Sequence, residues 1–392
     1  MDARALAALA ANPGCRRRAL LDGAGVDKGA LAQALGAPSN FGQSQFAHQR
    51  GNSFEARVKA DGGADLVRLL HERLRDGSEP PGPGAVATPD LTAPGPQGRT
   101  ARTALALREA TAAGGWALLD HPMVSLDVAG SPAFLEPDAV VVHPDGSWTV
   151  IEIKSFPMVD GSADPAKVGA AARQSAVYTL ALERVASMIG EPEEGGGAAE
   201  AAEAANRADR APARARVRHQ VLLVCPKDFS NLPTAELVDV RKQLAVTRRQ
   251  LDRLTRIEEI AAALPEGTTF DLRLTEDGRI PTRPVEELTA AVDAVDAAYA
   301  PECLSTCELA AHCRTRSRAA GQVEALGRGV RGELGGLTTV DAVLTAAMNG
   351  PAGEAPTGDP AVDALRRAAA LRAEALASRP ELASGPEAVA CR

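Results

Sequence analysis

The sequence predicts an α/β fold in which helices flank a mixed β-sheet. Residues 139–143 are a β-branched run, and a Pro-Asp-Gly turn then leads into residues 147–154, which alternate between two faces. This pattern is typical of a β-hairpin. Residues 217–224 form another strong strand pattern, and segments 99–113 and 166–190 are predicted helices. Strands interspersed with helices favour a layered α/β core.

Composition limits the classes of function. The 392 residues suffice for one large or two ordinary domains, and the net charge is −8. Residues 207–256 hold twelve basic and five acidic side chains, so the acidic total does not exclude a basic nucleic-acid groove. No apolar run approaches the length of a membrane span, and the short apolar N-terminus with Asp2 does not resemble a secretory signal. We therefore expect a cytoplasmic protein, whose six cysteines stay reduced and favour metal or cluster ligation where they are grouped.

The N-terminal region is predicted to be helical. Residues 1–21 form a helical pattern broken at 12–14, and three arginines follow Cys15. Neighbouring positive charge favours a thiolate, so Cys15 is a candidate ligand or reactive thiol, with an incidental buried cysteine as the alternative. A further helix is expected from Ser53. It would place Glu55 in the first turn, where the helix dipole favours an acid in any case.

The elements around the hairpin follow from local pattern. Residues 116–129 alternate as a strand pair is expected to, and would supply the first strand of the sheet beside the hairpin. Cys225 ends a strand and is interpreted as a core thiol. Segment 234–264 is predicted to be a long basic helical region, in which some arginines could contact phosphates and most form a solvated face. Residues 268–274 are predicted to be a strand and 285–299 a helix.

The residues best suited to catalysis lie on or beside the predicted hairpin. Glu152 and Lys154 point to one face of a strand, two residues apart, and Asp138 precedes the other strand. Two carboxylates can hold Mg²⁺ or Mn²⁺, and a lysine can orient water or stabilise charge on phosphorus. The alternative is a hairpin whose charged face lies in solvent. Downstream, Gln174 and Tyr178 share one face of a helix, four residues apart.

Together these residues resemble a known family. The motifs that carry the resemblance are Asp138, Glu152-x-Lys154 and Gln174-x-x-x-Tyr178, preceded by Gly51 and Glu55. In order and spacing this series is similar to the RecB-type branch of the PD-(D/E)xK nuclease superfamily, whose first motif has a Gly followed four residues later by His or Glu. The resemblance spans about residues 15–313.

The resemblance implies a restriction-endonuclease-like core that hydrolyses DNA with a divalent metal. It implies that Asp138, Glu152 and Glu55 bind the metal, with Glu55 in the position where some relatives have His. The other residues that it places at the catalytic centre are Lys154, Gln174 and Tyr178. A binding module of the same fold that holds DNA or a partner without cutting is the alternative.

Three cysteines are grouped near the C-terminal end in the pattern C-x3-C-x5-C, namely Cys303, Cys307 and Cys313. With Cys15 upstream, they resemble the iron–sulfur nucleases, such as AddB and the CRISPR-associated RecB-like exonucleases. The resemblance implies a [4Fe–4S] cluster in a subdomain that joins the two ends of the chain. The usual trio has one residue fewer in its first gap, so a structural zinc site that includes His312 stays open as the alternative.

The predicted organisation is an N-terminal helical region at 1–78, a Pro/Gly linker or loop at 79–98, and a nuclease core at 99–300. The core would include a disordered insertion at 191–215. A cysteine motif at 301–318 would follow, and then an Ala/Gly-rich tail at 319–392 with two predicted helices at about 340–348 and 361–378. The expected substrate is single-stranded DNA or DNA ends, in repair, recombination or phage defence. The expected partners are DNA and a helicase or other DNA-processing protein. No ATP-binding glycine loop is present, so no ATPase function is expected in this chain.

Overall fold

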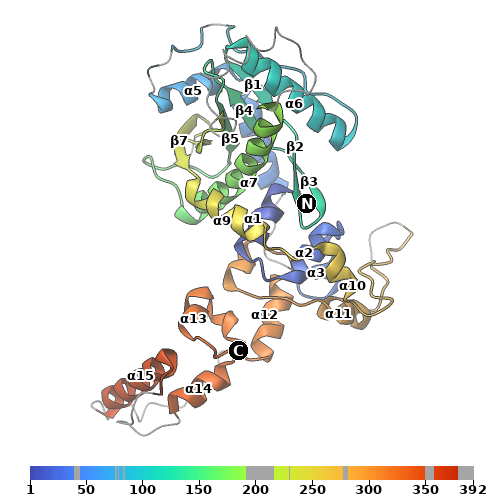
Figure 1. The fold of residues 1–392 in the computed structure, drawn as a ribbon, viewed down its shortest axis with the longest axis vertical. Coiled ribbons are helices and arrows are strands. Elements are labelled where there is room, and N and C mark those ends of the chain that lie inside the picture. The colour runs from blue at the N-terminus through green and yellow to red at the C-terminus, as the bar shows by residue number, and fades with distance from the viewer. Residues whose placement is uncertain are drawn as a thin grey trace, which may run out of the picture. The chain divides into compact units, whose positions relative to one another are not determined.

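The computed structural model describes residues 1–38, 45–75, 77, 79–82, 84–190, 216–228, 230–276, 281–348 and 357–377. The predicted insertion at 191–215 and Cys391 lie outside the described residues. The chain divides into two compact units (Figure 1). Unit 1 comprises Met1–Asp27, Gly42–Phe270 and Ala290–Asp296, and unit 2 comprises Lys28–Phe41, Asp271–Thr289 and Ala297–Arg392.

Unit 1 contains a five-stranded mixed sheet, which confirms the predicted α/β class. Its strands, in spatial order, are β1 (Ala117–Asp120), β4 (Ala139–Val142), β5 (Trp148–Ile153), β6 (Gln220–Pro226) and β7 (Pro233–Asp239). Neighbouring strands are antiparallel except β5 and β6, which are parallel. A parallel pair needs a long crossover, and the 26-residue helix α7 (Pro165–Gly190) lies in the connection between β5 and β6.

The predicted hairpin is present as β4 and β5. Val142 lies opposite Trp148, and Gly146 adopts a φ of +79° in the turn between them. The turn is braced because the Asp145 carboxylate accepts a hydrogen bond from the Ser147 amide at 2.8 Å. Every residue of both strands is buried. The solvated hairpin face that the sequence left open as an alternative is therefore wrong for β5.

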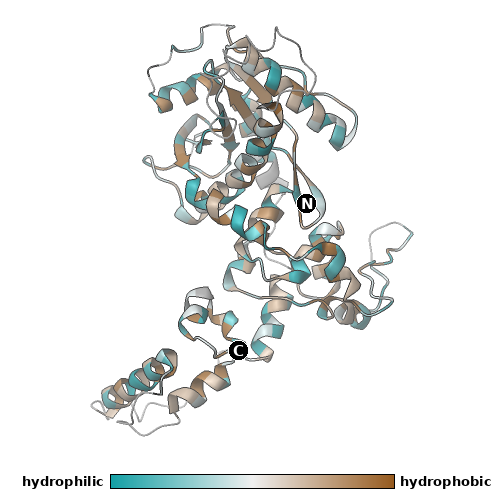
Figure 2. Cartoon of the chain, viewed as in Figure 1, coloured by the Kyte–Doolittle hydropathy of each residue, from teal (hydrophilic) through white to brown (hydrophobic). Residues whose placement is uncertain are grey.

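Helices cover both faces of the sheet, and the alternation of the strands separates two cores. On one face, α7, α1 (Ala3–Ala11) and α9 (Arg241–Leu251) pack against residues that include Val140 and Val150. On the other face, α4 (Gln45–Val58) and α5 (Ala64–Leu74) supply apolar side chains that pack with Val141, Ile151 and Ile153. Hydrophobic colouring accordingly concentrates on the strands in Figure 2. Glu152 shares a face with Val150 and so points towards the α7 side of the sheet.

Several predicted helices are confirmed. The N-terminal helix breaks near Asn12 into α1 and α2 (Arg16–Gly23), as the sequence indicated. Helix α6 (Gly95–Ala113) begins four residues before its predicted start, inside the segment interpreted as a linker. The C-terminal helices α14 (Val340–Met348) and α15 (Pro360–Ala377) are present in unit 2. No helix among the described residues has both the length and the apolar character that a membrane span requires.

Unit 2 also holds α3 (Lys28–Ala34) and, around the cysteine trio, the short helix η2 (Pro301–Ser305) and α12 (Ala310–Ala319). The helices η3 (Val323–Leu326) and α13 (Arg328–Glu333) follow. Helix α11 (Val285–Asp293) is shorter than the predicted helix 285–299.

Three local predictions are wrong. Segment 234–264 is not one helical region: its first residues belong to β7, and the helices α9 and α10 (Ile257–Ala262) follow. Residues 268–274 form no strand, apart from an isolated bridge at Leu274. Within 116–129, β1 joins the main sheet as predicted, whereas β2 (Val124–Val128) pairs with β3 (Ser131–Leu135) in a separate sheet. Strand β7 pairs with β6 and β2 pairs with β3, whereas 268–274 has only the isolated bridge, and local propensity does not encode which partner a strand will have.

Gly63 tests the packing of α5 against the sheet. It has a φ of +81°, and a Cβ built there would lie 2.0 Å from Cδ2 of the buried Leu118 in β1. Gly63→Ala should therefore lower the free energy of unfolding by about 1–2 kcal/mol for its left-handed backbone, and by roughly 1–3 kcal/mol more for overpacking. Gly25, with a φ of +69° and no atom within 4 Å, is the matched control.

Gly25→Ala should show only the backbone cost. The free energy of unfolding, measured by chemical denaturation of both variants, checks the difference. Equal losses would mean that the contact between Gly63 and Leu118 is looser than described.

Candidate functional site

The Asp138 carboxylate lies where the sequence predicted, beside the end of β5. Strand pairing explains this position, because Ala139 is opposite Ile151 and Asp138 precedes it by one residue. Its Oδ2 accepts a hydrogen bond from the Ile153 amide at 2.6 Å. Burial raises the pKa of Asp138, and the positive charge of Lys154 opposes that rise. The carboxylate is thus held against the residue between Glu152 and Lys154.

Glu152 and Lys154 are in direct contact. The Lys154 ammonium forms a short ion pair with Oε1 of Glu152, whose side chain is fully buried. Lys154 is 23% exposed, and its amide donates to the Val224 carbonyl of β6 at 2.9 Å. Burial raises the pKa of Glu152 to about 7, against the lowering effect of Lys154, and the charge of Asp138 raises it further. Apart from the lysine, the Glu152 carboxylate has no hydrogen-bond partner among the described residues.

Gln174 and Tyr178 interact along one face of α7, as their spacing predicted. The Gln174 Nε2 donates to the Tyr178 hydroxyl at 3.0 Å, and that hydroxyl donates to the Glu136 carbonyl at 3.1 Å. Burial raises the pKa of Tyr178 well above its usual value. Because Glu136 lies two residues before Asp138, the tyrosine fixes the segment that leads into Asp138. The pair therefore supports the carboxylate from the α7 layer.

Glu55 lies beside the group formed by Asp138, Glu152 and Lys154, but it is not at the start of a helix. Helix α4 begins at Gln45, so the prediction of Glu55 in a first turn is wrong and the helix-dipole explanation does not apply. Gly51 is one turn earlier, and a Cβ built there would lie 4.0 Å from that of Ser155. This face of α4 therefore packs against the chain just after Lys154.

The Glu55 carboxylate is fixed by two basic neighbours. Its Oε1 is 3.0 Å from the His121 Nε2 and 2.6 Å from the Lys59 Nζ. The hydrogen bond with His121, supported by Lys59, lowers the pKa of Glu55 to about 2 in spite of partial burial. The same contact raises the pKa of His121. Glu55 is therefore ionised at neutral pH.

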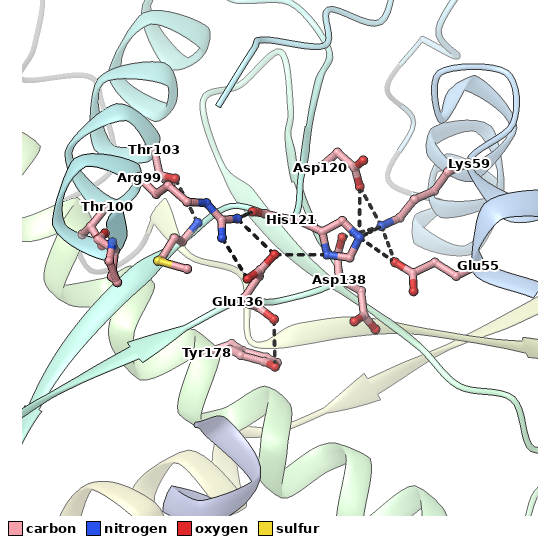
Figure 3. Close-up of polar contacts among 12 residues, drawn as sticks. Glu55, Lys59, Arg99, Thr100, Thr103, Asp120, His121, Glu136, Asp138 and Tyr178 are labelled. Atoms are coloured by element: carbon pink, nitrogen blue, oxygen red, sulfur yellow. Dashed lines mark hydrogen bonds and ion pairs between the residues drawn. The ribbon is translucent and has the colours of Figure 1, made fainter. Parts of the chain in front are cut away.

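The structure adds residues that the sequence analysis missed (Figure 3). They form a polar network along the ends of β1 and β3, and comprise Lys59, Arg99, Asp120, His121 and Glu136. Arg99 links two parts of it, because its guanidinium contacts the Glu136 carboxylate at 3.0 Å and the His121 carbonyl at 3.0 Å. Two signals could have indicated this network. Lys59 is four residues after Glu55, and Asp120 and His121 come directly after an apolar strand.

The cysteines are divided between the two units. Cys15 is buried at the start of α2 in unit 1, whereas Cys303, Cys307 and Cys313 belong to unit 2. The Cys307 amide donates to the Cys303 carbonyl at 2.8 Å. Burial raises the pKa of Tyr299, and Cys303 and Cys313 add to this rise, whereas Arg314 and Arg318 oppose it. In the described part of the chain no three His, Cys, Asp or Glu side chains are grouped as a metal site. The four-cysteine cluster and its zinc alternative stay predictions.

Two of the arginines beside Cys15 are held by other groups. Arg18 binds Asp22 at 2.9 Å, and both side chains are buried. Arg17 donates to the Val295 carbonyl at 3.1 Å and pairs with Asp293 at 3.4 Å. These contacts fix α2 against residues 293–296 of the same unit. Arg17 and Arg18 therefore have structural partners, although the sequence had suggested that their charge acts on the Cys15 thiol.

Arginines of the basic segment also bind carboxylates. Arg248 on α9 forms a short ion pair with Glu183 on α7, and Glu183 also contacts the His219 Nε2 at 3.0 Å. These contacts tie α9 to α7 and give Arg248 a structural role. Cys225 is buried, and burial raises its pKa to about 12, which confirms that it is a core thiol.

Comparison with known proteins finds no protein-family model, no curated protein and no solved structure that matches this chain. The function proposed for it therefore rests on the geometry of its own residues. The carboxylates of Asp138 and Glu152 are hard oxygen donors of the kind that Mg²⁺ and Mn²⁺ prefer. A buried carboxylate with an unsatisfied oxygen also gains from an added cation, so these residues fit a divalent metal.

The raised pKa of Glu152 predicts a pH-dependent stability. The groups that face Glu152 are Lys154 just after β5, Asp138, Tyr178 on α7, Arg4 on α1 and Cys225 on β6. A carboxyl whose pKa rises from 4.5 to about 7 on folding stabilises the protein fully below pH 4.5. That stability is lost as the pH rises through 7, where the folded protein must keep a buried carboxylate ionised.

In EDTA, raising the pH from 5 to 8 should therefore lower the melting temperature of the parent more than that of Glu152→Gln. Differential scanning calorimetry of both proteins at several pH values checks this. Parallel melting curves across that range would show that Glu152 titrates at its ordinary pKa.

Proposed function

We propose that this chain is a divalent-metal-dependent nuclease that hydrolyses phosphodiester bonds in DNA. One observation carries the proposal: Asp138, Glu152 and Lys154 meet at the end of β5 in the order that the resemblance to the RecB-type nucleases implies. Gln174, Tyr178 and Glu55 surround them from two other elements. The expected substrate is single-stranded DNA or DNA ends, with a helicase as a possible partner.

Asp138 and Glu152 would hold Mg²⁺ or Mn²⁺, with Glu55 as a third candidate ligand. When bound, the metal supplies Lewis-acid polarisation of the phosphate and a lowered pKa for its water. The Ile153 amide fixes the Asp138 carboxylate at 2.6 Å, and burial excludes bulk water from Glu152. These side chains therefore enter the reaction already positioned, which reduces reorganisation.

Lys154 would act on the substrate. Its side chain is 23% exposed, whereas that of its partner Glu152 is fully buried, so the lysine is the more accessible member of the pair. An ammonium at this position stabilises negative charge that develops on the scissile phosphate. Tyr178 holds the Glu136 carbonyl and so the segment before Asp138, while Gln174 orients the tyrosine hydroxyl.

Cleavage by purified full-length protein tests the proposal. With Mg²⁺ or Mn²⁺ it should degrade linear DNA, and EDTA should stop the reaction. Asp138→Asn, Glu152→Gln and Lys154→Met should each lower the rate by at least about 100-fold, because each removes charge from the reacting centre. Arg108→Met, on an exposed position of α6 outside the basic segment, is the control and should cut like the parent.

Each outcome of that assay has a defined meaning. DNA binding without cleavage by the parent would overturn the nuclease and favour the catalytically silent binding module. Cleavage by Glu152→Gln at the parent's rate would show that the reaction occurs elsewhere in the chain. Circular dichroism confirms that each variant is folded before its rate is compared.

The [4Fe–4S] cluster is proposed on Cys15, Cys303, Cys307 and Cys313, with zinc held by the trio and His312 as the alternative. Protein prepared without oxygen should contain about four iron atoms per chain, since such a cluster has four iron sites and four thiolate ligands. Cys15→Ala should lose iron and lower the melting temperature, and Cys225→Ala should keep the iron. Metal analysis that finds one zinc and no iron would replace the cluster by the zinc site.

A further inference from the structure

Lys59 is the most highly coordinated cation of the described network. Its ammonium lies 2.6 Å from Oε1 of Glu55, 2.6 Å from Oδ1 of Asp120 and 2.8 Å from the Asp138 carbonyl oxygen. The His121 Nε2 is 3.2 Å away. An ammonium has three N–H donors, and three oxygens at these distances satisfy them. The side chain is only 11% exposed, so Lys59 is a fixed internal charge with no donor left for a substrate.

The oxygens around Lys59 come from three separate segments. Glu55 belongs to α4, Asp120 is the last residue of β1, and Asp138 directly precedes β4. Without a cation between them, the carboxylates of Glu55 and Asp120 would repel each other at the half-buried edge of the sheet. Lys59 therefore connects the helix of the first motif to the strand ends beside the candidate active site (Figure 3).

Asp138 is held through both its backbone and its side chain. Its carbonyl oxygen accepts hydrogen bonds from Lys59 at 2.8 Å and from the His121 amide at 3.3 Å, and its carboxylate accepts one from the Ile153 amide at 2.6 Å. Lys59 makes the shorter of the two backbone contacts. Loss of Lys59 would leave the Asp138 carbonyl held by the longer contact alone, which would loosen the backbone there and weaken the contact with Ile153.

From this geometry we infer that Lys59 is a positioning residue, which aims the Asp138 carboxylate and fixes Glu55 for metal binding. It acts through these carboxylates and does not touch the substrate. The inference rests on the proposed function only in that Asp138 and Glu55 are taken as metal ligands. Residues that orient metal ligands in this way usually affect metal affinity as strongly as they affect rate.

Two measurements test this role in the full-length Lys59→Met variant. This substitution keeps a side chain of similar length and removes its positive charge. Titration calorimetry should show Mn²⁺ binding about 10-fold to 100-fold weaker than in the parent, as expected for loss of a group that orients ligands. Hydrogen exchange should show faster exchange of the Ile153 amide, because that amide reports on the Asp138 carboxylate. In cleavage assays kcat should fall while KM for DNA stays unchanged.

Matched variants separate positioning from general damage. Arg108→Met should leave Mn²⁺ affinity and Ile153 exchange as in the parent. Lys59→Arg keeps the charge and should recover most of the Mn²⁺ affinity that Lys59→Met loses. If Lys59→Met does not fold, Asp120→Asn weakens the same connection and should show the same two changes to a smaller degree.

The outcomes distinguish this inference from the proposed function. Unchanged Mn²⁺ affinity and unchanged Ile153 exchange in folded Lys59→Met would overturn the positioning role. A parent protein that neither binds Mn²⁺ nor cuts DNA would overturn the nuclease proposal. In that case exchange of the Ile153 amide still decides whether Lys59 positions Asp138.

Discussion

The pairing of β4 with β5 sets the positions of Asp138, Glu152 and Lys154 relative to one another. Ala139 lies opposite Ile151, so the Asp138 carboxylate reaches the amide of Ile153, the residue between Glu152 and Lys154. A shift of one residue in this register would move Glu152 to the opposite face of the sheet. The turn at Gly146 and the burial of alternate residues on both faces oppose such a shift. Register is therefore the constraint from which the site geometry follows.

The second constraint on the site is the burial of its charged side chains. Glu152 is fully buried, and its ion pair with Lys154 offsets part of the cost of removing a carboxylate from water. Glu55 and Asp120 share the ammonium of Lys59 in the same way. At Glu152 the ion pair does not offset the whole cost of burial, because the pKa of this carboxyl is raised to about 7. A site with surplus buried negative charge is suited to a divalent cation, which is why metal binding is the chemistry that these residues support best.

The two units carry different chemistry. The carboxylates and lysines of the candidate nuclease site all belong to unit 1, together with the sheet that positions them. The cysteine trio belongs to unit 2, on η2, α12 and the turn between them. The hard oxygen ligands therefore all belong to unit 1, whereas three of the four soft thiolate candidates belong to unit 2 and the fourth, Cys15, belongs to unit 1.

Local sequence alone determined the hairpin, the long helix α7 and the grouping of Asp138, Glu152 and Lys154, because turn residues and side-chain periodicity act within a few positions. It could not determine that 234–239 forms a strand, since that depends on pairing with β6. Nor could it reveal the burial of Glu152 or the role of Lys59, whose three oxygen partners come from segments up to 79 residues away. Tertiary structure decided these features because charge, desolvation and strand pairing depend on neighbours in space.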